Sequence, residues 1–145
     1  MTGARNVVGG LVLLSLGLAA GLGMSLYAFT PLMAVPPPLA HYDDLPRRLV
    51  RLAHIAAVML PLINIVLGPW LDRLRLPGRI RHAASWLLLL GAAGLPLSLA
   101  LEAFIPPLIV LHLPALPALG FTLAVWLVAA GACRTDFAKE VSHAT

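Results

Sequence analysis

The amino-acid sequence predicts an all-α integral membrane protein, a four-helix bundle with almost nothing outside the bilayer. Three observations lead to this fold class. Of the 145 residues, 60% are hydrophobic and only 11% are charged, whereas a soluble domain has about 45–50% apolar and about 25% charged residues. A soluble globule of this length has too small an interior to bury so much apolar surface. The apolar residues also gather in four runs, each close to the ~20 residues that a helix needs to cross a bilayer.

The four apolar runs define the expected helices of a single transmembrane domain, residues 1–145. They cover about residues 7–30, 49–71, 83–101 and 108–133. Helices are expected because a helix satisfies its backbone hydrogen bonds within lipid, and because the runs lack the alternation of barrel strands. The first run continues past Tyr27 without a charge, so it is too long for the apolar region of a signal peptide and is interpreted as a retained helix.

Basic residues in the connectors predict the orientation of the bundle. Four arginines lie in residues 73–81, and Arg5 and Arg134 share that side of an even-numbered bundle. The opposite side carries a smaller cluster, Arg47, Arg48 and Arg51. Because cytoplasmic loops carry the excess of Lys and Arg, we expect a multi-pass protein of the bacterial inner membrane with both termini in the cytoplasm.

The net charge of +4 does not indicate a nucleic-acid partner. The basic residues are confined to short connectors between apolar runs, where they are typical of topology determinants and of contacts with lipid headgroups. Membrane lipid is therefore the expected partner, together with other membrane subunits or a second copy of the chain.

Small residues and one amide are the expected means of helix packing. Lipid is as apolar as leucine, so helices in a membrane associate through close backbone approach and hydrogen bonds. Gly17 and Gly21 form a GxxxG pair in the first run, which we assign to packing within the chain rather than to a dimer. Asn64, near the middle of the second run, is expected to hydrogen-bond to a neighbouring helix.

Two histidines are the candidate cofactor ligands. His54 and His112 lie near the starts of the second and fourth runs, which both begin on the outer side, so the two residues should lie at similar depth. Facing histidines on different helices are the arrangement that ligates haem b. Glu102 is expected at the same level, and His41 in the connector above it.

The same level of the membrane could instead hold a copper or zinc ion. Histidine and carboxylate ligands suit both metals, and the additional donors would be His41, Glu102, Asp43 or Asp44. The competing interpretation is that the histidines are unrelated and that each one bonds to its own surroundings.

No catalytic motif is present in the sequence, and we do not expect an enzyme. The expected function is that of an accessory or structural subunit of a bacterial membrane complex, in a respiratory or electron-transfer setting if haem b is bound. The alternative is a small transporter or channel-like protein without a cofactor, which would call for intramembrane charge and broken helices.

Overall fold

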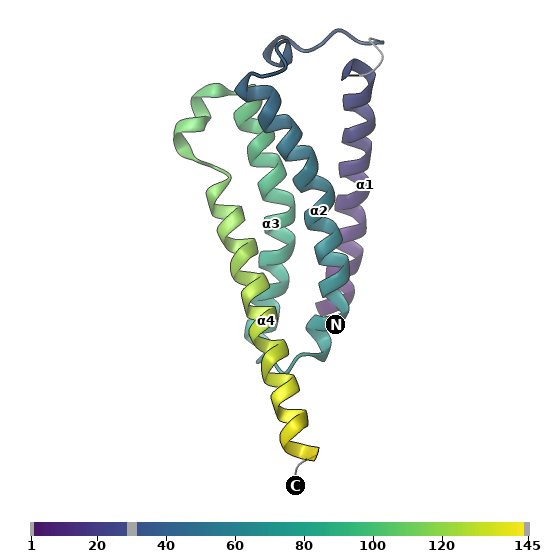
Figure 1. Cartoon of the computed structure of the whole chain (residues 1–145), viewed down its shortest axis with the longest axis vertical. Coiled ribbons are helices and arrows are strands. Elements are labelled where there is room, and N and C mark those ends of the chain that lie inside the picture. The colour runs from purple at the N-terminus through teal and green to yellow at the C-terminus, as the bar shows by residue number, and fades with distance from the viewer. Residues whose placement is uncertain (1, 29–31, 144–145) are drawn as a thin grey trace.

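The computed structural model describes the backbone of residues 2–28 and 32–143 and the side chains of residues 2–28 and 32–134. Over these residues the chain is helical and contains no strand. The long helices are α1 (Thr2–Ala28), α2 (Leu45–Arg73), α3 (Gly78–Phe104) and α4 (Ala115–His143), and the connectors contain the short 3-10 helices η1 (Pro37–Leu39) and η2 (Pro106–Leu111). Figure 1 shows the four long helices running up and down along one axis. All four are long and apolar enough to cross a membrane, which confirms the predicted all-α bundle.

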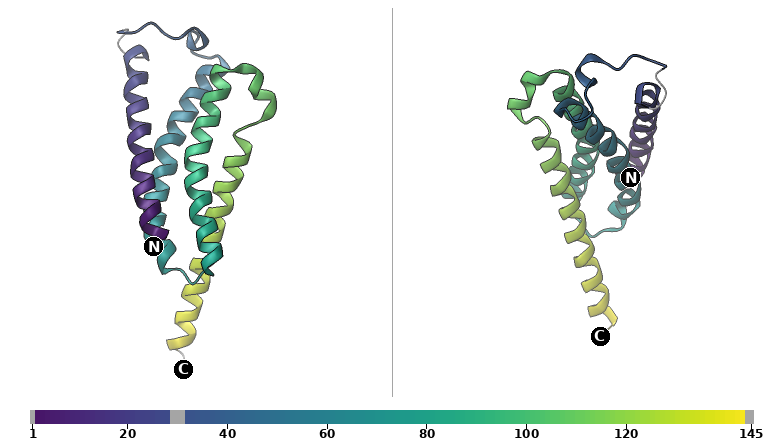
Figure 2. Two further views of the ribbon diagram at one scale, coloured as in Figure 1. Left: turned by 180° about the vertical axis from the view of Figure 1, so that it is seen from behind. Right: turned by 45° about the horizontal axis from the view of Figure 1, so that its top comes forward.

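The bundle has two different ends. The end that we call the terminal end carries the start of α1 and the tight connector between α2 and α3 (Figure 1). The opposite loop end carries the connector from α1 to α2, with η1, and the connector from α3 to α4, with η2. The last turns of α4 extend past the other helices beyond the terminal end, as both views of Figure 2 show. The start of α1 and the end of α4 therefore lie toward the same end of the molecule.

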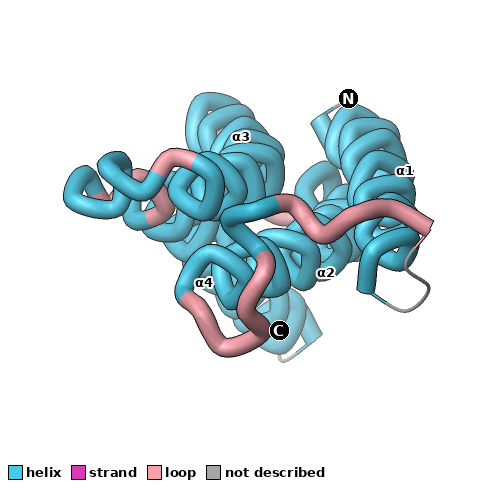
Figure 3. The backbone as a smooth tube through the Cα atoms, turned by 90° about the horizontal axis from the view of Figure 1, so that it is seen from above, coloured by secondary structure: helices cyan, strands magenta, loops and turns pink. Residues whose placement is uncertain are grey.

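The helices form an open arrangement rather than a closed ring. Helix α2 packs between α1 and α3, α1 also touches α3, and α4 packs mainly against α3. Seen along the bundle axis in Figure 3, α1 and α4 lie on opposite sides of the α2–α3 pair. Helix α4 consequently has one main neighbour within the chain.

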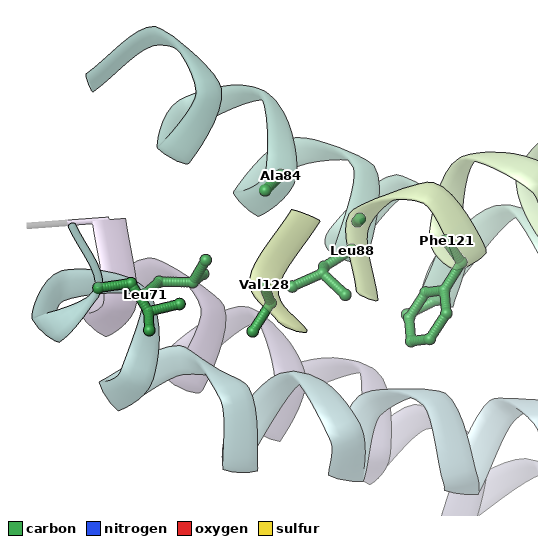
Figure 4. Close-up of a cluster of buried hydrophobic side chains, with 8 residues drawn as sticks. Leu71, Ala84, Leu88, Phe121 and Val128 are labelled. Carbon is green, nitrogen blue, oxygen red and sulfur yellow. The ribbon is translucent and has the colours of Figure 1, made fainter. Parts of the chain in front are cut away.

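The largest apolar core joins α2, α3 and α4 near the terminal end. Leu88 of α3 is fully buried there beside Phe121 and Val128 of α4, and Leu71 closes the cluster from α2 (Figure 4). Gly91 allows α3 and α4 to approach, because a Cβ at this position would lie 2.7 Å from the Cβ of Phe121. Close backbone approach is how helices gain packing contacts when lipid offers no hydrophobic driving force.

Glycines seven residues apart form the contact between α1 and α2. Gly3, Gly10 and Gly17 each face a backbone carbonyl of α2 so closely that a Cβ would overlap it. These carbonyls belong, in the same order, to Gly68, Pro61 and Ala57. Gly17 is thus a packing position between α1 and α2. By contrast, a Cβ on Gly23 of α1 would meet no atom within 4 Å.

The contact between Gly17 and the Ala57 carbonyl involves a carbonyl that a proline, Pro61, leaves without a helical hydrogen bond. Pro61 has no N–H group, so it cannot donate the helical hydrogen bond that the Ala57 carbonyl would otherwise accept. Helix α2 nevertheless continues through Pro61 and Pro69 without interruption. The carbonyl of Ala57 is covered instead by Gly17 of α1, in the type of contact where a Cα–H group approaches a carbonyl oxygen.

The helix boundaries differ from the predicted spans in every helix. Helices α2 and α3 extend beyond their predicted spans, 49–71 and 83–101, at both ends. Helix α1 already begins at Thr2, whereas its predicted end at residue 30 lies outside the described residues. Helix α4 begins at Ala115 rather than at Leu108. Hydropathy marks residues 108–114 as apolar, but Pro114 disfavours the helical conformation at the residue before it. This segment forms η2 and a turn instead.

Candidate functional site

The chemically most distinctive site lies at the loop end between α1 and α2. A cavity of ≈340 Å³ opens there, and its polar lining consists of the side chains of Ser25, Tyr27, Tyr42, Arg47, Arg51 and His54. The guanidinium carbon of Arg51 lies 4.3 Å from the ring centroid of Tyr42, and that of Arg47 lies 5.0 Å from the same centroid. Both distances are in the range of cation–π interactions. Two positive groups therefore share one aromatic ring at the wall of the cavity.

A second cavity of ≈370 Å³ adjoins the first and is almost entirely apolar. Met24, Tyr27, Val50 and His54 line both cavities, so the two spaces meet along these side chains. The connector covers the apolar cavity through Leu39, which is 1% exposed. Arg47 holds this cover in place, because its Nη1 donates a hydrogen bond of 3.3 Å to the Leu39 carbonyl.

His54 stands at the junction of the two cavities. Its ring lies against Gly21 of α1 so closely that a Cβ on Gly21 would overlap the imidazole. Gly21 is thus required for the position of this ring, beyond any role in helix packing. The Nδ1 atom of His54 is buried and has no hydrogen-bond partner within the described chain.

His112 does not lie within a helix, which corrects its predicted position in the fourth span. It follows η2 in a left-handed backbone conformation, with φ 48°. Its side chain is exposed and turns back on its own connector, with Nδ1 3.0 Å from the carbonyl oxygen of Val110. Pro114 lacks the N–H group that would have occupied this carbonyl in a continuous helix.

The other predicted ligands are also separate from His54. Glu102, in the last turns of α3, is only 5% exposed, and its Oε1 accepts a hydrogen bond of 2.9 Å from the Leu113 backbone N–H. It therefore fixes the connector between α3 and α4. His41 is exposed in the connector between α1 and α2. No cavity described here is lined by both His54 and His112.

The side chains that could ligate a metal also form no metal site in the described part of the chain. Residues 2–28 and 32–134 contain no group of three or more His, Cys, Asp or Glu side chains placed to hold an ion. The pairing of His54 with His112 and the binding of haem b thus gain no support from the geometry and stay predictions.

A buried polar network joins three helices on the opposite half of the bundle. Asn6 of α1, Asn64 of α2 and Ser85 of α3 are all 0% exposed. The Asn6 amide donates to Asn64 Oδ1 at 2.8 Å and to the Ser85 carbonyl at 3.2 Å, while the Ser85 hydroxyl donates to Asn6 Oδ1. Asn64 Nδ2 in turn donates to the carbonyl of Leu88 at 3.0 Å.

Charged groups continue this network to the terminal end. Arg5 donates from Nη2 to the Ser85 hydroxyl at 2.7 Å and lies 4.3 Å from the ring centroid of Trp86. Asp72, at the end of α2, accepts hydrogen bonds from the backbone N–H groups of Thr2 and Gly3 and from the Thr2 hydroxyl. The first N–H groups of a helix have no partner within it, so Asp72 supplies the acceptors that α1 lacks.

Two sequence features indicate these sites, although hydropathy alone does not reveal them. Arg47 and Arg51 are four residues apart, a spacing that places them on one helix face. Asn6 directly precedes the first predicted span, where a buried amide is easily overlooked.

A large apolar groove of ≈650 Å³ lies between α3 and α4. Its lining is apolar apart from Ser98, and it includes Gly91 and Gly94 of α3 and Gly120 of α4. The side chains along its sides remain largely uncovered, with Leu116 80% and Leu119 68% exposed. The groove therefore lies on the outer surface of the bundle.

Comparisons of the chain with protein-family models, with curated proteins and with solved structures found no significant match.

Proposed function

We propose that the protein is a non-catalytic accessory or structural subunit of a larger membrane complex. One observation carries the proposal: among the described residues, each of the six polar residues that are buried as a whole bonds to the chain itself. These side chains are Thr2, Asn6, Asn64, Ser85, Ser98 and Glu102. Transport and catalysis within a membrane require polar groups that face a substrate or an ion. Five of these six groups instead hold helices or a connector together, and Ser98 bonds within its own helix. The buried atoms without a partner, Arg5 Nε, His54 Nδ1 and Arg81 Nε, belong to half-buried side chains.

The placement of α4 supports attachment to another protein. Helix α4 packs mainly against α3, and the groove between them exposes large leucines beside small residues. Small residues let a further transmembrane helix approach closely. In the proposal, a helix of another subunit occupies the α3–α4 groove.

The proposal does not depend on a cofactor. The respiratory setting was predicted from His54 and His112, and these residues lie on different elements, with one ring bonded to its own connector. A bacterial inner-membrane location with cytoplasmic termini belongs to the proposal. It is supported by the arginines of the terminal end, Arg5 and residues 73–81.

Site-specific photo-crosslinking in the native membrane tests the proposal. A photoreactive amino acid replaces Leu119 in the groove. In the control it replaces Leu18, which is also a leucine and is 57% exposed on α1. We expect one discrete adduct with another membrane protein from position 119 and none from position 18. Equal crosslinking from both positions, or no protein adduct from either, would contradict the proposal.

A second measurement separates this function from the transporter alternative. The purified chain is reconstituted into vesicles and assayed for ion and solute flux. We expect fluxes equal to those of empty vesicles, because the polar groups in the bundle interior bond to one another. A specific flux through the isolated chain would favour the channel or transporter reading instead.

A further inference from the structure

We infer that the loop end between α1 and α2 is a binding site for one anionic phospholipid, with its phosphate beside Arg47 and Arg51 and one acyl chain in the adjoining apolar cavity. The inference depends on four features: the paired arginines, the lack of a carboxylate partner, the junction of a polar with an apolar cavity, and the open space at Gly23.

The two arginines are arranged to bind a phosphate. Each guanidinium carries several N–H donors in a plane and binds phosphate through paired hydrogen bonds. Tyr42 holds both groups on one ring, at 5.0 Å for Arg47 and 4.3 Å for Arg51. Both side chains are half-buried at the cavity wall. Their donors are thus restricted in position before a ligand arrives, which lowers the entropic cost of binding.

The two arginines form no ion pair within the described chain, and the nearest carboxylates in sequence, Asp43 and Asp44, are exposed and do not line the cavity. Neither Arg47 nor Arg51 forms an ion pair with a carboxylate among residues 2–28 and 32–134. No Asp or Glu lines the cavity, and Glu102 is engaged with the α3–α4 connector. Two like charges held close together repel each other, so an anion between them removes an unfavourable term. Basic pockets between transmembrane helices bind the phosphates of lipid headgroups in this way.

The adjoining apolar cavity indicates that the anion carries a hydrocarbon chain. Its ≈370 Å³ are lined by small and apolar side chains of α1, α2 and α3, and it shares Met24, Tyr27, Val50 and His54 with the cationic cavity. A free phosphate would use only the first space, and a protein helix is too wide for the second. An amphiphile with a negative head and an apolar tail fits both.

His54 marks the boundary between the head and tail regions. It lines both cavities, and the chain leaves its Nδ1 without a partner. The ester and glycerol oxygens of a phospholipid lie between phosphate and acyl chain, at the level where the imidazole stands. His54, which the sequence predicts as a haem ligand, is thus part of the inferred lipid site.

Competition binding of lipids to the full-length chain tests the inference. The protein in a neutral detergent is incubated with equal amounts of phosphatidylglycerol and phosphatidylcholine, and the bound lipid is counted by native mass spectrometry. The two headgroup variants are Arg47→Gln and Arg51→Gln. Arg48→Gln is the matched control, since Arg48 lies on the same helical turn, is exposed and does not line either cavity.

We expect phosphatidylglycerol to be preferred by the unmodified chain. Each removed arginine should weaken its binding about fivefold, the equivalent of ~1 kcal/mol per basic residue at a membrane surface. Arg48→Gln should leave the preference unchanged. Equal binding of the two lipids, or an Arg48→Gln loss as large as that of Arg51→Gln, would overturn the inference.

A separate variant tests the apolar cavity that is inferred to hold the acyl chain. Gly23 lines it, and a Cβ there meets no atom within 4 Å, so Gly23→Leu places a side chain at the cavity wall from a position with free space. Ala19→Leu, at an exposed position on the same helix, is the control. We expect a several-fold loss of phosphatidylglycerol for Gly23→Leu and none for Ala19→Leu. No loss for Gly23→Leu, together with displacement of the lipid by millimolar inorganic phosphate, would show a simple anion site and refute the lipid assignment.

Folding of each variant is checked separately by circular dichroism and by thermal unfolding without added lipid. A variant counts only if its melting curve matches that of the unmodified chain. Arg47 also bonds to the Leu39 carbonyl, so Arg51→Gln, which breaks no hydrogen bond described in the structure, decides the headgroup question.

Discussion

Replacing Asn64 with alanine is the sharpest test of how this bundle is held together. Asn64 is fully buried, accepts a hydrogen bond from Asn6 of α1 and donates one to the Leu88 carbonyl of α3. Asn64→Ala removes both contacts between helices. It leaves the Asn6 amide bonded to the Ser85 carbonyl, so no buried donor loses every partner.

The expected cost follows from these contacts. Hydrogen bonds between helices in a membrane contribute ~0.6 kcal/mol on average and at most about 1.7 kcal/mol each. Two lost bonds therefore predict that the free energy of unfolding falls by about 1–3 kcal/mol. The coupling between Asn6→Ala and Asn64→Ala in a double-mutant cycle should be ~0.6 kcal/mol, since one bond joins the two residues.

Unfolding in mixed detergent and dodecyl sulfate micelles, followed by tryptophan fluorescence and circular dichroism, measures these free energies. Ser98→Ala is the matched control, because Ser98 is buried but bonds only to the Leu95 carbonyl of its own helix. A cost for Ser98→Ala equal to that for Asn64→Ala, or a coupling energy indistinguishable from zero, would refute the assignment of stability to the network.

Three further predictions address packing, the α3–α4 connector and topology. Gly17→Leu should destabilise the bundle by roughly 1–3 kcal/mol through overlap with the Ala57 carbonyl, whereas Gly23→Leu should be neutral in the same micelle assay; equal effects would contradict the packing. Glu102→Ala removes the acceptor of the Leu113 N–H, at a cost of about 1–3 kcal/mol, and should speed hydrogen exchange at that amide, while unchanged exchange would disprove its role. A C-terminal alkaline phosphatase fusion should be inactive in bacteria and a C-terminal green fluorescent protein fusion should fluoresce, and the reverse pattern would place the terminal end outside.

The fold could be predicted because its cause is distributed over the whole chain. Four apolar runs of sufficient length have few alternatives to helices in lipid, and four such helices are present. The helix ends could not be predicted as well, because hydropathy does not report backbone conformation. Residues 108–114 are apolar apart from His112, yet Pro114 and the left-handed backbone of His112 keep them outside α4.

The candidate site was less accessible to sequence reasoning because partners depend on which faces meet. Asn64 was expected to bond to another helix, but nothing in the sequence around it identifies Asn6 as the residue that donates to its Oδ1. His54 and His112 have similar spacing from the starts of their runs, and only the fold shows that they belong to different elements. Arg51 was interpreted through its charge alone, whereas its contact with Tyr42 depends on the path of the connector.

The contact of Gly17 with the Ala57 carbonyl bears on how the chain enters the membrane during synthesis. Pro61 leaves that carbonyl without a helical donor, and an unpaired carbonyl within hydrocarbon is costly. Helix α1 precedes α2 in the chain and emerges from the ribosome first. The glycine that covers the carbonyl is therefore already present when α2 is inserted, so the order of translation supplies the partner before it is needed.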